Sequence, residues 1–200
     1  MYQRVGLETT LPGSTVEYYK LNYQISNYWP IIPAIVLNTR FELGYGDSYG
    51  KDSSGVITNA DGTTRPVTAT GLPFYENFYA GGTNSVRGFE DNTLGPRSEA
   101  INGFNRGQPL GGSLKTVGSV EMYFPKLFDS PSARISAFFD FGNVYSDVDA
   151  FKANELRAST GVALLWRAPV GPISISYAFP LKKEDNDEIE RLQFTFGGQF

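Results

Sequence analysis

Segments in which apolar and polar side chains alternate are the dominant feature of this sequence. The clearest is TVEYYKLNYQIS, at residues 15–26. Its apolar side chains are Tyr19, Leu21, Tyr23 and Ile25, and the alternate positions hold Lys20, Asn22, Gln24 and Ser26. Successive side chains of a β-strand point to opposite faces, so a period of two predicts a strand with one apolar and one polar face.

The same alternation recurs along the chain when odd and even positions are compared separately. The predicted strands lie near Arg4 to Leu11, at 15–26, 34–46, Leu114 to Phe124, 133–145, 156–166, 173–181 and 191–200. None of the segments between them has a convincing helical period. We therefore expect an all-β fold of about eight antiparallel strands.

The connections between the predicted strands alternate in length. NYWPIIP, FDSPS and APVGP are short and contain proline, whereas 47–113, YSDVDAFKANE and KKEDNDEIE are longer and polar. Short turns on one side and long loops on the other are typical of a transmembrane β-barrel. A soluble β-sandwich, which also alternates, is the alternative. Long strands and a polar face of Gly, Ser and opposite charges favour the barrel, as do aromatic residues expected to form interfacial girdles: Tyr28, Trp29, Tyr145 and Trp166.

The composition excludes several kinds of site. Because the chain has no cysteine and no histidine, it cannot form a disulfide, a thiolate nucleophile, a histidine-based triad or a Cys/His metal site. We therefore predict no enzyme, no cofactor and no metal. A net charge of −4 without a basic stripe argues against nucleic acid. The acidic stretch 184–188, with Asp147 and Asp149, lacks the spacing of a calcium loop and is interpreted as solvated loop tips.

The connection at 47–113 is far longer than connections within a domain usually are. Its second half, at 73–97, reads PFYENFYAGGTNSVRGFEDNTLGPR, with aromatic residues and glycines around Arg87. PFYENFYAGG, then VRGF, then NTLGPR resemble the extracellular loop that enters the barrel lumen in the BamA family of outer-membrane insertases. PGSTVEYYK, ELGYGDSYG, FFDFGNVY, APVGPISISYAFPLKK and the final strand are similar to that family's strands in the same order. The resemblance covers nearly the whole chain.

This resemblance implies a barrel architecture. Residues 1–200 would form one outer-membrane barrel domain, the C-terminal half of a barrel of roughly sixteen strands, with 47–113 folded into its lumen. The periplasmic repeats of the family are absent. Met1 is followed directly by strand-like sequence and not by a signal peptide, so we expect the natural N-terminal part to be missing.

Half a barrel has two open edges, which lipid does not tolerate. The chain would either close as a small barrel of about eight strands, or pair edge to edge with a second copy. Closure would expel Arg87, because the interior of a small barrel is filled by its own side chains. The sequence leaves both arrangements open.

The resemblance further implies that Arg87, within the tetrapeptide Val86, Arg87, Gly88 and Phe89, points into the lumen and pairs with acids on inner strand faces. The alternation independently places Glu121 of SVEMYFP and Asp140 of FFDFGNVY on polar faces, where each is the only acid of its strand. A guanidinium in a partly dehydrated lumen needs such partners. We predict an ion-pair cluster of these three side chains.

By resemblance, the chain would assemble outer-membrane β-barrel proteins by templating their strands at the barrel seam. An exposed strand edge offers unpaired backbone groups to an incoming strand. The predicted seam and C-terminal signal residues are Leu192, Phe194, Phe196, Gly197, Gly198 and Phe200.

The implied partners are unfolded outer-membrane barrel clients, other subunits of an assembly complex bound through the missing periplasmic part, and the lipid bilayer with its lipopolysaccharide. The alternative function is a translocation pore of the two-partner secretion or TamA type, which shares the VRGF tetrapeptide. FYAGG before the tetrapeptide and NTLGPR after it favour the BamA family.

Overall fold

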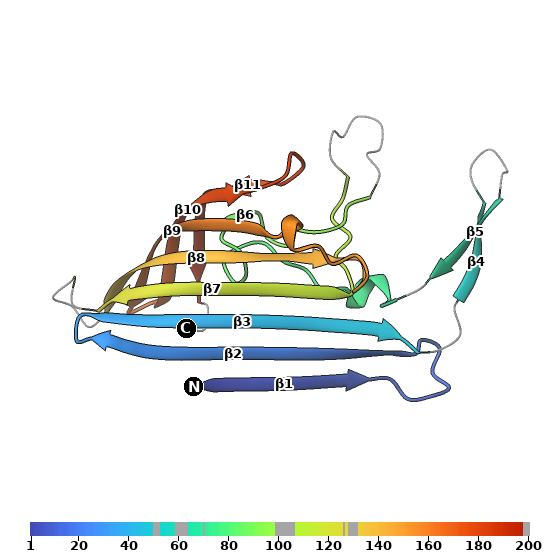
Figure 1. Ribbon diagram of the computed structural model, residues 1–200, viewed down its shortest axis with the longest axis horizontal. Helices are drawn as coiled ribbons and strands as arrows, with labels where there is room; N and C mark the ends of the chain where they lie inside the picture. Colours follow the sequence, from blue (N-terminus) through green and yellow to red (C-terminus); the bar gives the residue numbers. More distant parts are fainter. Residues whose placement is uncertain are drawn as a thin grey trace.

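One antiparallel sheet of eight strands forms the frame of the molecule (Figure 1). The computed structural model describes residues 1–49, 53–58, 64–69, 71–98, 107–125, 127 and 132–197. In sheet order the strands are β1 (Tyr2–Thr9), β2 (Tyr18–Ile32), β3 (Ile35–Ser48), β7 (Leu114–Phe124), β8 (Ala133–Tyr145), β9 (Arg157–Ala168), β10 (Gly171–Lys182) and β12 (Leu192–Phe196). Each sheet strand pairs with the next one along the chain, which confirms the predicted antiparallel all-β fold.

Smaller elements lie in the connections. β4 (Ser53–Thr58) and β5 (Thr64–Ala69) form a hairpin, and β6 (Gly88–Phe89) pairs with β11 (Ile189–Glu190). Two single 3₁₀ turns, η1 (Phe74–Glu76) and η2 (Ala153–Glu155), follow β5 and β8. No helix among the described residues is long and apolar enough to cross a membrane.

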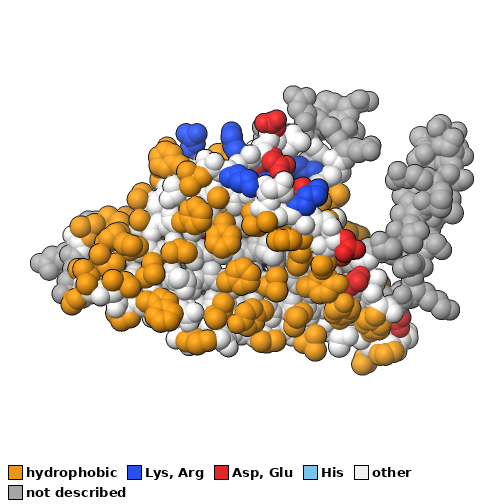
Figure 2. Space-filling model, in the orientation of Figure 1, with side chains coloured by type: hydrophobic (Ala, Val, Ile, Leu, Met, Phe, Trp, Pro, Cys, Tyr) orange, Lys and Arg blue, Asp and Glu red, His pale blue; other side chains and the backbone are white. Residues whose placement is uncertain are grey.

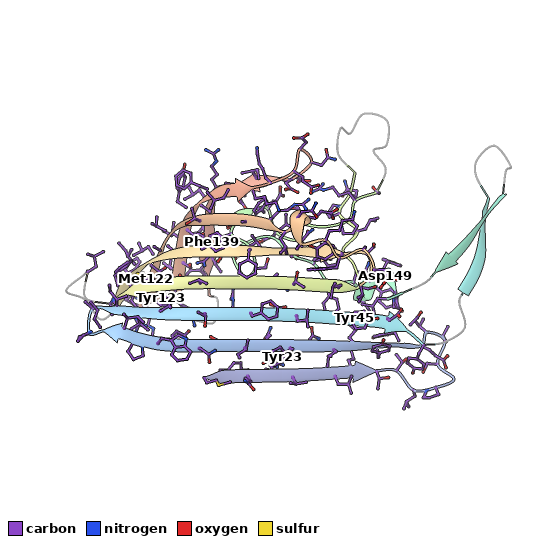
Figure 3. All side chains as sticks on the ribbon, in the orientation of Figure 1. Tyr23, Tyr45, Met122, Tyr123, Phe139 and Asp149 are labelled. Atoms are coloured by element: carbon purple, nitrogen blue, oxygen red, sulfur yellow. The ribbon has the colours of Figure 1, made fainter. Side chains whose placement is uncertain are left out.

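The outward face of the sheet is apolar and exposed, because the register keeps the predicted alternation in phase from strand to strand. Its exposed large side chains include Val5, Leu7, Leu21, Val120, Met122, Phe139, Val162, Trp166, Ile175, Tyr177, Phe179 and Phe194. Figure 2 shows hydrophobic side chains over the sheet strands, and Figure 3 labels Tyr23, Met122 and Phe139 on their strands. An apolar surface of this extent suits hydrocarbon and not water.

The inward face is polar but buried. Its buried side chains are Asn38, Ser119, Glu121, Ser136, Asp140, Ser159, Ser176 and Gln193. Residues 71–98 and 107–113, called the lumen loop from here on, lie against this face. A compact apolar cluster joins Ala80, Val86, Phe89 and Leu94 of the loop to Val117 of β7 and Val144 of β8. The core therefore sits between the loop and the sheet, where the loop can hold the strands together.

The boundaries of β7 and β8 match the predicted segments, but β2 is longer than predicted. The segment NYWPIIP was interpreted as a turn, whereas β2 continues to Ile32 and the turn falls between Ile32 and Ile35. The register shifts between Pro30 and Ile32, so Pro30 is accommodated at an irregularity. Proline lacks a backbone donor and is tolerated in strands at such positions.

Two of the four predicted girdle aromatics do not face outward as free side chains. Because β2 continues, Tyr28 falls on the inward face and its ring stacks on Tyr123, with centroids 6.4 Å apart. Tyr145 is buried and packs against Phe151 of the following loop, with centroids 5.1 Å apart. Trp29 and Trp166 are exposed, as a girdle requires.

The sheet is open. β1 and β12 stand at the two ends of the strand order, and no pairing joins them among the described residues. The small closed barrel that the sequence left open is therefore not the arrangement observed, and Arg87 keeps its place against the inward face. Each end strand has one paired edge and one edge without a strand in the described part of the chain.

Candidate functional site

Backbone bridges within the lumen loop fold it back on itself. Isolated bridges join Phe78 to Gly112, Ala80 to Leu94 and Arg97 to Pro109, so the loop doubles back on itself. At its centre the chain turns sharply at Gly81 and Gly82, both with positive φ. A Cβ at Gly81 would lie 2.3 Å from the carbonyl oxygen of Glu90, so only glycine allows this approach. The turn presents the next residues to the sheet.

Arg87 binds two acids on adjacent strands. Its Nε and Nη2 donate to Asp140 Oδ2 and Oδ1 of β8, at 2.7 and 2.9 Å. Its Nη1 and Nη2 donate to Glu121 Oε1 and Oε2 of β7, at 3.2 and 3.3 Å. The backbone N–H of Arg87 also donates to Asp140, at 3.2 Å. The planar guanidinium meets both carboxylates with two bonds each, a geometry that lysine cannot reproduce.

Two serines on the same face hold the carboxylates in place. Ser119 Oγ donates to Asp140 Oδ1 at 2.6 Å, and Ser136 Oγ donates to Glu121 Oε1. Asp140 is fully buried, and the other members of the cluster are nearly so. The side chains lie on polar faces of adjacent strands, and Arg87, Ser119 and Glu121 also line a cavity on the inward face.

Phe138 completes the site, and sequence reasoning did not find it. The guanidinium carbon of Arg87 lies 3.5 Å from the centroid of the Phe138 ring. This is a cation–π contact in a desolvated setting, where such contacts are strongest. Phe138 shares the inward face of β8 with Ser136 and Asp140. An aromatic residue in the polar phase of an otherwise alternating strand was the available signal.

The electrostatics of the site favour a permanently charged arginine. Burial acts to lower the pKa of Arg87, but the hydrogen bonds and charges of Asp140 and Glu121 outweigh it and raise the pKa. The side chain carries one positive charge against two nearby carboxylates. Breaking such a buried cluster by removing one member typically costs about 3–5 kcal/mol, because the remaining charges stay uncompensated.

The neighbours of Arg87 explain the rest of the tetrapeptide. Val86 and Phe89 are fully buried in the apolar cluster between loop and sheet. Gly88 has a φ of +92°, and a Cβ there would lie 2.9 Å from the Cβ of Ala178 on β10. The backbone at Gly88 therefore lies directly on β10, an approach that any side chain would prevent.

The predicted seam residues lie elsewhere, at the end of the sheet. Leu192, Phe194 and Phe196 of β12 point outward and are exposed, away from the Arg87 cluster. Gly197 follows with a φ of +76°, and its N–H donates to the carbonyl of Pro172 at 2.9 Å. Gly198 and Phe200 lie outside the described residues.

The interpretation of 184–188 as a solvated tip is wrong for Asp187. Its side chain is buried and accepts hydrogen bonds from Arg157 of β9, with Nε 3.0 Å from Oδ2. The neighbouring Glu188 accepts from Arg97 of the lumen loop at 2.7 Å. The positive charge that pairs with Asp187 comes from Arg157, thirty positions earlier. The acidic pattern at 184–188 alone could not predict this partner. Asp147 and Asp149 are exposed, as predicted.

Metal binding has no support in the described residues, which contain no group of three or more acidic side chains arranged to hold an ion. The described contacts of the site are structural. It fixes a loop inside a curved sheet and leaves the last strand at the border of that sheet.

Comparison with known proteins decides the family. A model of the Omp85 superfamily domain matches residues 1–200. This chain belongs to the Omp85 superfamily. The outer membrane protein assembly factor BamA of Neisseria meningitidis is 33% identical over 98% of the chain, and that of Nitratidesulfovibrio vulgaris is 31% identical over 64%. The sorting and assembly machinery component 50 homolog of Mus musculus is 25% identical over 91% of the chain.

A solved structure of this superfamily has the same fold. BamA from Haemophilus ducreyi, crystallised without POTRA domains 1–3, matches 96% of this chain with a TM-score of 0.76 and 32% identity. The chain spans 37% of that structure and 26% of the Neisseria protein. The eight strands of the open sheet thus match part of the length of that structure.

Proposed function

We propose that this chain is the core of an outer-membrane insertase, which assembles β-barrel proteins and inserts them into the bacterial outer membrane by strand templating at the barrel seam. The observation that carries this proposal is the match of nearly the whole chain, lumen loop included, to proteins named outer membrane protein assembly factors. Its location is the bacterial outer membrane, which agrees with the apolar outward face.

The edge of β12 is where an incoming strand would pair. Hydrogen bonds from Ala178 N to the Arg191 carbonyl and from Gly197 N to the Pro172 carbonyl fix which residues bond β10. By antiparallel alternation, Gln193 and Thr195 direct their backbone groups to β10. The backbone groups of Leu192, Phe194 and Phe196 therefore point to the opposite edge, where they are available for β-augmentation by a client.

The lumen loop would brace the barrel while its seam opens. A barrel that admits a new strand loses hydrogen bonds along that seam, and the remaining strands must keep their curvature. The Arg87 cluster ties the loop to β7 and β8 in the middle of the described sheet. We propose that this attachment keeps the fold intact during client assembly.

The proposed partners follow from this role. They are unfolded outer-membrane barrel proteins, subunits of an assembly complex, and the lipid bilayer with its lipopolysaccharide. The alternative function is a translocation pore of the two-partner secretion or TamA type. The similarity to assembly factors favours the insertase.

Proline at Phe194 tests the templating proposal. In the full-length protein, Phe194→Pro removes one free-edge N–H and leaves the bonds of Gln193 and Thr195 to β10 in place. Phe194→Ala is the matched control, because it removes the ring but keeps the N–H. We expect Phe194→Pro to abolish assembly of client barrels in cells depleted of their own insertase, while Phe194→Ala supports it, at equal levels in the membrane. Equal client assembly by both variants would refute templating at this edge.

A further inference from the structure

Gln193 joins the last strand of the sheet to the lumen loop. It lies on the inward face of β12 and is almost completely buried. Its Oε1 accepts a hydrogen bond from the Gly88 N–H at 3.2 Å, and its Nε2 donates to the Phe89 carbonyl at 2.8 Å. A side-chain amide has one acceptor group and one donor group, as a peptide unit has. Gln193 therefore binds the loop backbone as a neighbouring strand would.

The groups that Gln193 binds belong to the tetrapeptide around Arg87. β6 is only two residues long, and its other side pairs with β11. The positive φ of Gly88 and its contact with Ala178 bring this backbone within reach of β12. A buried backbone N–H without a partner is costly, so the amide of Gln193 meets a requirement of the loop as well as of the strand.

β12 has few other attachments to the protein. It is five residues long and pairs with β10 along one edge. Its outward side chains are exposed, so they add little packing within the chain. On the inward face, two further contacts are described: the hydroxyls of Thr195 and Thr83 lie 3.2 Å apart, and Gln193 Nε2 donates to Glu190 Oε2 of β11 at 3.4 Å. The lumen loop thus supplies most of the described inward attachments of the strand.

Arg87 and Gln193 hold adjacent parts of the same tetrapeptide. Arg87 fixes it to β7 and β8, and Gln193 fixes β12 to it. We propose that Gln193 is a positioning residue through which the lumen loop sets the position of the client-pairing edge, so that release of this contact frees β12 to move. This inference rests on the insertase function proposed above.

Amide hydrogen exchange tests the contact itself. The Gln193→Leu variant keeps the approximate size of the side chain and removes both hydrogen bonds to the loop, together with the longer one to Glu190. In the full-length protein in detergent, we expect roughly tenfold faster exchange of the Gln193 and Thr195 amides, which bond β10, the effect of losing about one net buried hydrogen bond. Ser176→Ala is the matched control, since Ser176 faces Gln193 across the strand pair and its buried Oγ has no hydrogen-bond partner in the described structure. Unchanged exchange in Gln193→Leu would overturn the proposal.

A reversible cross-link tests whether the contact must open. The 200-residue sequence has no cysteine, so Thr83→Cys with Thr195→Cys introduces a single candidate disulfide. We expect client assembly to stop when the pair is oxidised and to return on reduction. Full assembly with a quantitatively formed disulfide would contradict release of β12.

These outcomes separate the two proposals. If the protein has no insertase function, the exchange result on Gln193→Leu is unaffected, and the reduced double variant fails as completely as the oxidised one. If only the positioning role is wrong, client assembly proceeds in both redox states.

Discussion

Among the described residues, the clusters around Arg87 and Arg157 differ in what surrounds each arginine. Arg87 lies at the middle of the sheet between two buried carboxylates, with serines behind them and an aromatic ring over the guanidinium. Arg157 binds one buried carboxylate, Asp187, and one carboxylate that is half exposed, Glu184. The second cluster is therefore more exposed to water than the first.

This difference indicates which of the two clusters contributes more to the stability of the fold. In the Arg87 cluster, every charged group depends on the others, because each charged side chain is 10% exposed or less. In the Arg157 cluster, both partner acids lie in the connection between β10 and β11, outside the eight-stranded sheet. We therefore expect the first cluster to control the stability of the barrel domain and the second to control only local order.

The largest expected effect is that of Arg87→Ala. It leaves Glu121 and Asp140 buried without a cation, and we expect the free energy of unfolding to fall by about 3–5 kcal/mol. Urea unfolding of the full-length protein in detergent measures the loss. Limited proteolysis should then cleave the lumen loop faster. Glu121→Gln combined with Asp140→Asn should do the same, and loop cleavage at the parent rate in all these variants would refute the ion-pair cluster.

Asp187→Asn sharpens the comparison at the second cluster. The substitution keeps the size of the side chain and removes its charge, and Glu184 can still offset part of the charge of Arg157. We expect a loss of about 1–3 kcal/mol. Cleavage should become faster within 183–188 and stay unchanged in the lumen loop. A loss as large as that of Arg87→Ala would show that the two clusters contribute equally to the free energy of unfolding.

Phe138→Leu isolates the contribution of the aromatic ring. Leucine fills much of the same volume but offers no π face to the guanidinium 3.5 Å away. We expect a loss of about 1–2 kcal/mol in the free energy of unfolding. Phe139→Leu, on the exposed outward face of the same strand, is the control. Equal losses in both variants would mean that the ring acts through packing alone.

The smallest expected effect is that of Lys152→Ala. Its ion pair with Glu155 is 3.0 Å long but solvent-exposed, and exposed pairs contribute within about 1 kcal/mol. We expect no measurable change in the urea midpoint. A loss comparable to that of Asp187→Asn would show that burial does not determine how much each ion pair contributes to stability.

The alternation of side chains predicted the strands and the faces to which their residues belong. Glu121 and Asp140 could be placed on the inward face because parity along a strand is a local property. The resemblance in the loop supplied the arginine that joins them. Tyr28 was misplaced because the end of β2 was set too early.

Contacts between distant segments were not predictable in the same way. Parity placed Gln193 on the inward face but could not say that it would bind the backbone at Gly88, over one hundred positions earlier. The pairing of Asp187 with Arg157 was missed for the same reason. Such contacts depend on how the loop folds over the sheet. The alternation of side chains along a strand does not indicate which loop residues will lie against it.

A double-mutant cycle of Arg87→Ala and Asp140→Asn tests the central claim, that a buried ion pair fixes the lumen loop to the sheet. Measured by urea unfolding of the full-length protein, the two substitutions should be non-additive by about 2 kcal/mol or more, since contacting groups of one network couple. The cycle of Arg87→Ala with Lys152→Ala should be additive within about 0.5 kcal/mol. Additive losses in both cycles would contradict the account.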